Sequence, residues 1–148
     1  SHVLRIIREL IEFQPKGKGT DVAAALKYVT SVIKKKAIVF VLSDFISDGY
    51  QHTLKIVSGK HDVTGIRVYD EREENIPNVG LVQMMDRETG EHIMVNTGSR
   101  SVREAYAAYF RNRENYFKDS FTRSGAGVIN SRVDESYVKK LLGYFKNR

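Results

Sequence analysis

Apolar residues recur every three or four positions along five stretches of the chain, which is the spacing of an amphipathic helix. The predicted helices lie at 3–13, 20–35, 50–58, 101–124 and 135–145. The first ends before Pro15, and the second opens with Thr20 and Asp21, residue types that suit a helix N-terminus. Gly59 and Gly125 follow the third and fourth stretches, where glycine commonly ends a helix.

Runs of β-branched and aromatic residues predict strands between these helices. The runs lie at 37–42, 62–69, 81–85, 93–95 and 127–129. The run at 37–42 has no polar alternation, which is typical of a strand covered on both faces. A five-residue loop ending in Gly90 joins the third and fourth runs and predicts a β-hairpin. The strand–helix–strand order of the first two runs predicts a βαβ unit in an α/β protein with a mostly parallel sheet.

Length and composition exclude several classes of protein. The 148 residues are enough for one domain with its own core. There is no cysteine, and so no disulfide, catalytic thiolate or zinc–thiolate site. No apolar run approaches the roughly 20 residues of a membrane span, and the first residues do not resemble a signal peptide. We expect a cytoplasmic protein without a membrane span.

The net charge of +6 raises the question of nucleic-acid binding. The one run of three basic residues, 34–36, follows a predicted helix, where cations interact favourably with the helix dipole. Cations of helix 101–124 are interleaved with acids, so we expect them in solvent. The residues expected to face the core are Val102, Tyr106, Tyr109, Phe110 and Phe117. Nucleic-acid binding by this basic helix is kept as the alternative function.

Candidate chemistry is sparse. The loop at 15–20 lacks the contiguous Gly-Lys-Ser/Thr of a phosphate-binding loop, and no nucleophile–base arrangement stands out. Thr20 precedes a helix, and Asp44 follows a buried strand, at the sheet edge where α/β proteins bind ligands. Their oxygens suit Mg²⁺. Taken alone, these residues are better explained by local capping, by Thr20 or Asp21 on the helix and by Asp44 on a turn.

Several ordered blocks of sequence resemble domain-of-unknown-function family 58, a family of von Willebrand factor A-like proteins. The blocks are Lys18-Gly19-Thr20-Asp21-Val22-Ala23-Ala24-Ala25-Leu26, Val39-Phe40-Val41-Leu42-Ser43-Asp44-Phe45, His61-Asp62-Val63, Ile66-Arg67-Val68-Tyr69-Asp70, Val79-Gly80-Leu81 and Asp86-Arg87-Glu88-Thr89-Gly90. The resemblance covers essentially the whole chain. It implies a Rossmann-like, doubly wound, mostly parallel sheet with flanking helices, here with a β-hairpin added.

The resemblance also implies a metal-ion-dependent adhesion site that holds Mg²⁺. Thr20 and Asp44 match two of its elements, whereas its first element, an Asp-x-Ser-x-Ser strand, is absent from the chain. We therefore expect residues 1–148 to form a single partial domain, truncated at its N-terminus. The metal site should be incomplete, with Mg²⁺ bound in the full-length protein and none in this fragment.

The function implied by the resemblance is non-enzymatic. We expect a protein–protein interaction module that works with a MoxR-type AAA+ ATPase in protein maturation or stress response. Because the missing strand would pair with the strand at 37–42, we expect that strand to have an open edge and the fragment to form a homo-oligomer.

Overall fold

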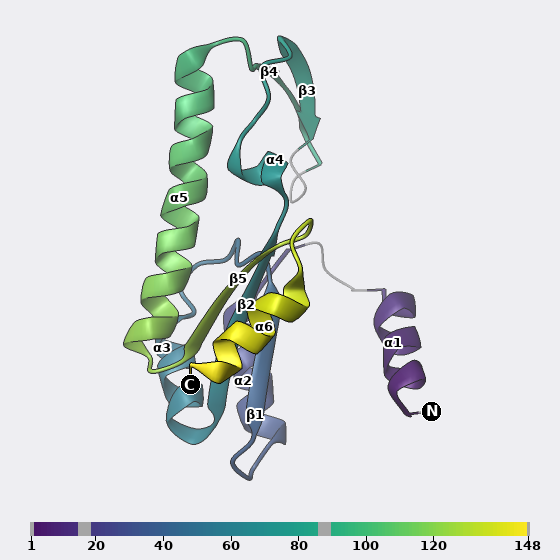
Figure 1. The fold of residues 1–148 in the computed structure, drawn as a ribbon, viewed down its shortest axis with the longest axis vertical. Coiled ribbons are helices and arrows are strands. Elements are labelled where there is room, and N and C mark those ends of the chain that lie inside the picture. Colours follow the sequence, from purple (N-terminus) through teal and green to yellow (C-terminus); the bar gives the residue numbers. More distant parts are fainter. Residues whose placement is uncertain (1, 15–18, 86–89, 148) are drawn as a thin grey trace.

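The computed structural model describes residues 2–14, 19–85 and 90–147, and over these residues it is a mixed α/β structure with a long helix along one side (Figure 1). The helices are α1 (His2–Glu12), α2 (Val22–Val32), α3 (Gln51–Lys60), α4 (Glu71–Glu74), α5 (Arg100–Arg123) and α6 (Tyr137–Lys146). The strands are β1 (Ile38–Ser43), β2 (Asp62–Tyr69), β3 (Leu81–Met85), β4 (His92–Asn96) and β5 (Gly127–Arg132). The loop residues 15–18 and 86–89 lie outside the described residues.

The strands form two sheets. One is a parallel three-stranded sheet in the order β1-β2-β5, and the other is the antiparallel hairpin β3-β4. In the parallel sheet, Val41 of β1 lies beside Gly65 of β2, and Gly65 lies beside Val128 of β5. The mostly parallel sheet and the hairpin expected from the sequence are thus confirmed.

One face of the parallel sheet is covered by α2, α3 and α5, and this layer holds the hydrophobic core. The core residues are Val22, Leu26, Val39, Phe45, Tyr50, Leu54, Val57, Val63, Phe117 and Phe121. Gly65 of β2 lets α5 come close, because a Cβ there would lie 2.5 Å from the ring of Phe121. This close approach brings α5 near the carboxyl ends of the strands.

The opposite face of the sheet is only partly covered, by α6. The Tyr144 and Thr64 hydroxyls are hydrogen bonded at 3.0 Å, and Phe145 packs edge-to-face on Phe40. Even so, Ile38, Phe40 and Leu42 of β1 are 66%, 44% and 66% exposed. The expectation that this strand is covered on both faces is therefore wrong for one face.

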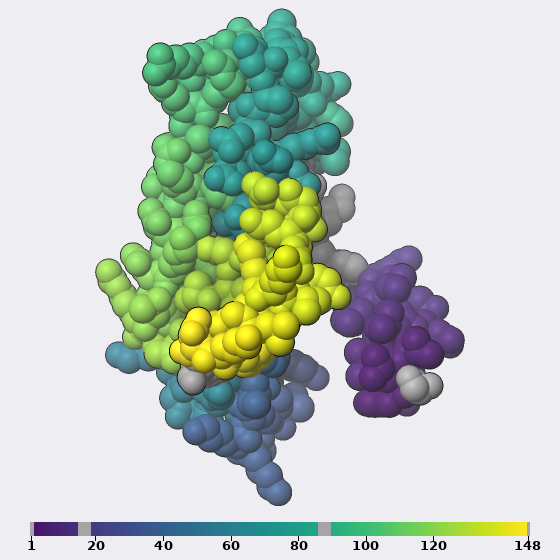
Figure 2. Space-filling view, viewed as in Figure 1, coloured from purple at the N-terminus to yellow at the C-terminus, as the bar shows by residue number. Residues whose placement is uncertain are grey.

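Helix α1 lies to one side of the sheet, and none of its residues is buried (Figures 1 and 2). Its apolar stripe is exposed along its whole length, from Val3 to Ile11. No helix among the described residues is both long enough and apolar enough to cross a membrane.

Several element boundaries differ from the sequence prediction. Helix α2 ends at Val32 because Ile33 adopts an extended backbone, and its N–H closes the last turn on Val29. Helix α3 continues through Gly59 to Lys60. The short helix α4 was not predicted, and Asp70 caps it by accepting a hydrogen bond from the Arg72 N–H.

The inward face of α5 is narrower than predicted. Phe110 and Phe117 are buried and Val102 and Tyr106 are half-buried, but Tyr109 is 54% exposed. One residue along a helix rotates the side chain by about 100°, so Tyr109 points away from the stripe that contains its neighbour Phe110.

Candidate functional site

The candidate site surrounds the 44–49 loop, which follows the carboxyl end of β1. Asp44 begins this loop and is half-buried. Its Oδ1 accepts a hydrogen bond from the Ile46 N–H at 3.2 Å and another from the Ser43 hydroxyl at 3.3 Å. This is the local turn pattern that aspartate favours. One oxygen of the carboxylate is thus already engaged in holding the turn.

Thr20 lies across from this loop, in the segment before α2. It is exposed and lines a polar hollow of about 590 Å³ together with Ser47, Asp48 and Tyr109. The Val22 N–H donates to the Ser47 hydroxyl at 3.4 Å and ties the two segments together. Thr20 is therefore beside the loop that Asp44 begins, although Asp44 itself does not line the hollow.

Asp21 has a structural role. Its Oδ1 accepts a hydrogen bond from the Ala24 N–H at 2.8 Å and so caps α2. The expectation that a residue of this pair caps the helix is confirmed for Asp21. Its capping oxygen is less available to a ligand for the same reason.

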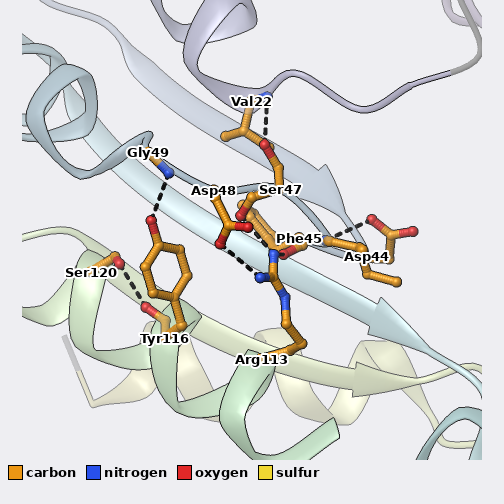
Figure 3. A network of polar contacts seen from close by, with 10 residues as sticks. Val22, Asp44, Phe45, Ser47, Asp48, Gly49, Arg113, Tyr116 and Ser120 are labelled. Atoms are coloured by element: carbon orange, nitrogen blue, oxygen red, sulfur yellow. Dashed lines mark hydrogen bonds and ion pairs between the residues drawn. The ribbon is translucent and has the colours of Figure 1, made fainter. Parts of the chain in front are cut away.

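Arg113 of α5 holds the loop from the opposite side (Figure 3). Its side chain is 13% exposed, and Nη1 donates to the Asp48 carboxylate at 2.7 Å. Nη2 donates to the carbonyls of Ser47 and Phe45 at 2.7 and 3.2 Å. This position corrects the expectation that all the cations of the helix lie in solvent.

Gly49, the last residue of the loop, is also held by α5. Its N–H donates to the Tyr116 hydroxyl at 2.9 Å (Figure 3). The backbone of Gly49 has a φ of 73°, which glycine adopts easily. Arg113 and Tyr116 together hold this loop along its length.

A second arginine, Arg67 of β2, lies beneath the start of the loop. It is 2% exposed, and its Nε donates to the Asp44 carbonyl at 3.3 Å. Its guanidinium stacks on the rings of Phe110 and Tyr69, at 4.4 and 4.9 Å from their centroids. Burial lowers the pKa of Arg67, while the nearby Glu114 carboxylate acts in the opposite direction. A buried arginine of this kind is costly and needs such partners.

The residues around the hollow do not form a complete magnesium site. Within the described ranges, no three His, Cys, Asp or Glu side chains are grouped to hold a metal ion. Asp48 is paired with Arg113, and that guanidinium places a positive charge where a cation would enter. Thr20 and Asp44 offer two oxygen ligands, whereas Mg²⁺ prefers near-octahedral coordination.

Sequence reasoning missed both arginines of the site. Arg113 lies three residues after Phe110 and four before Phe117, so it shares their inward stripe. Arg67 interrupts the apolar run of β2 between Ile66 and Val68. Both positions carried a signal, namely a cation at a place where the apolar pattern predicts burial.

Comparison with known proteins identifies similar sequences. The chain is 24% identical over 135 residues to the uncharacterised protein MAV169 of Mycobacterium avium, covering 90% of this chain and 79% of that protein. It is 22% identical over 135 residues to the uncharacterised protein Rv1480 of Mycobacterium tuberculosis. That match covers 90% of this chain but 42% of the longer relative.

Two solved structures have a similar fold. One is the conserved hypothetical protein BatB from Bacteroides thetaiotaomicron, with a TM-score of 0.51 and 16% identity over 97% of this chain and 67% of that one. The other is a serine-substituted aerotolerance-related membrane protein from Bacteroides fragilis, with a TM-score of 0.52 and 18% identity. That match covers 100% of this chain and 71% of the other. At such low identity, the likeness concerns the fold alone.

A family model supplies the clearest assignment. The model described as "Protein of unknown function DUF58" matches residues 1–116. The match includes α1, the parallel strands β1 and β2, the hairpin and the 44–49 loop. The chain therefore belongs to the DUF58 family of proteins of unknown function.

Proposed function

We propose that this chain is a non-enzymatic protein-interaction module and that its partner binds at the hollow beside Thr20. The observation that carries the proposal is the way the 44–49 loop is held by Arg67, Arg113 and Tyr116. A loop fixed before binding loses little conformational entropy when a partner arrives. The Asp48 carboxylate and the Tyr109 ring stay exposed at this surface, and both offer contacts to a partner.

Mg²⁺ has a limited place in this proposal. The family resemblance implies a bridging ion in the full-length protein, with Thr20 and Asp44 among its ligands. Because the described ligand set is incomplete, we expect calorimetric titration of this chain with MgCl₂ to show no tight binding. A dissociation constant in the micromolar range would contradict this expectation.

The partner we propose is a MoxR-type AAA+ ATPase in the cytoplasm, as the resemblance implies. Biolayer interferometry with the purified MoxR-type ATPase of the same organism tests this. Tyr109→Ala should weaken binding by about ten-fold, as truncation of an exposed aromatic at an interface centre often does. Tyr28→Ala is the matched control, because Tyr28 is also an exposed tyrosine and lies on α2. Absence of binding by the unmodified chain would exclude this partner, and equal losses in both variants would exclude the hollow as its site.

The alternative, nucleic-acid binding by α5, receives less support from the contacts. Most cations of this helix are engaged: the ion pairs are Arg100–Glu104, Arg113–Asp48, Lys118–Glu114 and Arg123–Asp119. Arg103 donates to the carbonyls of Thr97 and Gly98. Sub-micromolar binding to DNA or RNA at physiological salt in a gel-shift assay, abolished by Arg111→Glu, would favour the alternative.

A further inference from the structure

The methionines of the chain are concentrated in one element. There are three of them, Met84, Met85 and Met94, and all lie on the β3-β4 hairpin. The hairpin is at the end of the molecule opposite α3 (Figure 1). Methionine is among the residue types most often buried, yet Met85 and Met94 are 57% and 65% exposed. Packing in a core therefore does not account for these two side chains.

The strand pairing of the hairpin places both exposed methionines beside a histidine. Met85 of β3 lies directly opposite His92 of β4, and Met94 follows His92 by two residues on the same strand. Successive side chains of a strand point to opposite faces, so Met85, His92 and Met94 share one face of the hairpin. His92 is exposed as well. Met84 belongs to the other face and is half-buried.

These three side chains are close enough to bind one ion. Directly opposite residues of an antiparallel pair have Cβ atoms about 4.5–5.5 Å apart, and diagonal neighbours are about 7–8 Å apart. Met85 and His92 are a direct pair, and Met85 and Met94 are diagonal neighbours. Residues two apart on one strand, such as His92 and Met94, are about 7 Å apart. The thioether sulfur and the imidazole Nδ1 each lie two bonds beyond Cβ, so all three donor atoms can converge above this face.

Two thioethers and one imidazole form a ligand set for a soft metal ion. Thioether sulfur is uncharged and polarisable and favours Cu(I), and imidazole also binds copper. Mg²⁺ and Ca²⁺ require oxygen ligands, and a single imidazole without a thiolate or carboxylate is a poor set for Zn²⁺. In the described part of the chain, no three His, Cys, Asp or Glu side chains are grouped as a harder alternative.

We propose that Met85, His92 and Met94 form a binding site for Cu(I) on the exposed face of the hairpin. The antiparallel register brings the two thioethers and the imidazole to one place without a change in the backbone. The site shares no residue with the hollow beside Thr20, and it uses none of the loop 86–89.

Competition with bicinchoninate, a chromophoric Cu(I) chelator, in anoxic buffer measures the affinity. The unmodified chain should bind one Cu(I) with a micromolar or lower dissociation constant. Met85→Leu and Met94→Leu keep the apolar volume and remove the sulfur, so each should raise this constant about ten-fold or more. Met84→Leu is the matched control and should leave it unchanged, because Met84 is on the other face. Absence of binding by the unmodified chain, or equal losses in all three variants, would overturn the proposal.

A pair of histidine variants tests the imidazole ligand. His92→Ala should weaken Cu(I) binding about ten-fold or more, whereas His52→Ala, which removes an exposed histidine of α3, should not. Excess MgCl₂ should not displace the ion, because Mg²⁺ does not bind thioethers. Equal effects of the two histidine variants, or displacement by Mg²⁺, would overturn the proposed ligand set.

Methyl NMR of the unmodified chain locates the ion directly, because the chain has three methionine methyl groups and each gives one signal. One equivalent of Cu(I) added to protein labelled with ¹³C at these methyls should shift the signals of Met85 and Met94. The Met84 signal should move much less, and the three leucine variants assign the signals. Equal shifts of all three signals, or no shift at all, would overturn the proposal.

Discussion

Phe45 combines an unfavourable backbone conformation with complete burial. Its φ is 56°, and its ring stacks on Phe117 with centroids 4.4 Å apart. A positive φ at a bulky residue costs free energy, and only the surrounding packing maintains it. The packing of the α5 rings therefore fixes the conformation at the start of the loop.

Two substitutions at Phe45 should reveal this strain. Loss of the ring should lower the free energy of unfolding by about 3–5 kcal/mol in both Phe45→Ala and Phe45→Gly. In most positions glycine is about 0.5–1 kcal/mol less stable than alanine. Here the order should be reversed or equal, because glycine tolerates a positive φ. Urea denaturation measures both values, and a clearly less stable glycine variant would contradict the strain.

Gly65 and Gly59 should respond to alanine in opposite directions. At Gly65 an added Cβ meets the rings of Phe117 and Phe121 at 2.5–2.7 Å, so overpacking should destabilise the fold by about 1–3 kcal/mol. At Gly59, within α3, nothing lies within 4 Å of the added Cβ, and alanine should stabilise by about 0.5–1 kcal/mol. Thermal or urea unfolding gives the sign of each change.

At the level of single residues, sequence reasoning found positions more reliably than roles. It placed Thr20 and Asp44 at element boundaries, and the structure shows Thr20 beside the loop that Asp44 begins. It could not show that Arg67 and Arg113 bind the carbonyls of this loop. Spacing identifies the face on which a side chain lies, but hydrogen bonds to distant carbonyls depend on tertiary structure.

Helix α5 stabilises the 44–49 loop mainly through Arg113, and this contact can be isolated. Arg113→Gln should lower the free energy of unfolding by about 1–3 kcal/mol, because part-buried carbonyls lose their donor. Arg111→Gln, on the exposed side of the same helix, should change it by less than about 0.5 kcal/mol. Chemical denaturation of both variants makes the comparison, and equal effects would mean that Arg113 does not hold the loop.

Elements were predicted well where local pattern decides them. The hairpin strands and the end of α5 at Arg123, shortly before Gly125, follow from short-range signals. Coverage of β1 on both faces was predicted and is wrong for one face, because an uninterrupted apolar run shows that a strand can be buried without showing which neighbours cover it. The position of α1 likewise depends on contacts that its own amphipathic pattern cannot specify.

Over the whole molecule, stability should be uneven. β2 is bonded on both sides, whereas the β3-β4 hairpin has no third strand among the described residues. Two-stranded sheets are marginal by themselves. Hydrogen exchange measured by mass spectrometry should therefore show β2 amides as the slowest and the hairpin amides as much faster. Equal protection of both would indicate that the hairpin is held by contacts as cooperative as those of the core.

The 24 residues of α5 span about 36 Å, so a movement at one end of this helix can be transmitted along it to the other end. Near the start of α5, Arg103 donates hydrogen bonds to the carbonyls of Thr97 and Gly98, which follow the hairpin. Near its other end, Phe117 and Phe121 anchor α5 in the core, and Arg113 lies between Arg103 and these two rings. A displacement of the hairpin should therefore reach the loop at reduced amplitude. We expect Arg103→Gln to shift the NMR signals of the 44–49 amides. Unchanged signals would show that α5 does not transmit a displacement of the hairpin to this loop.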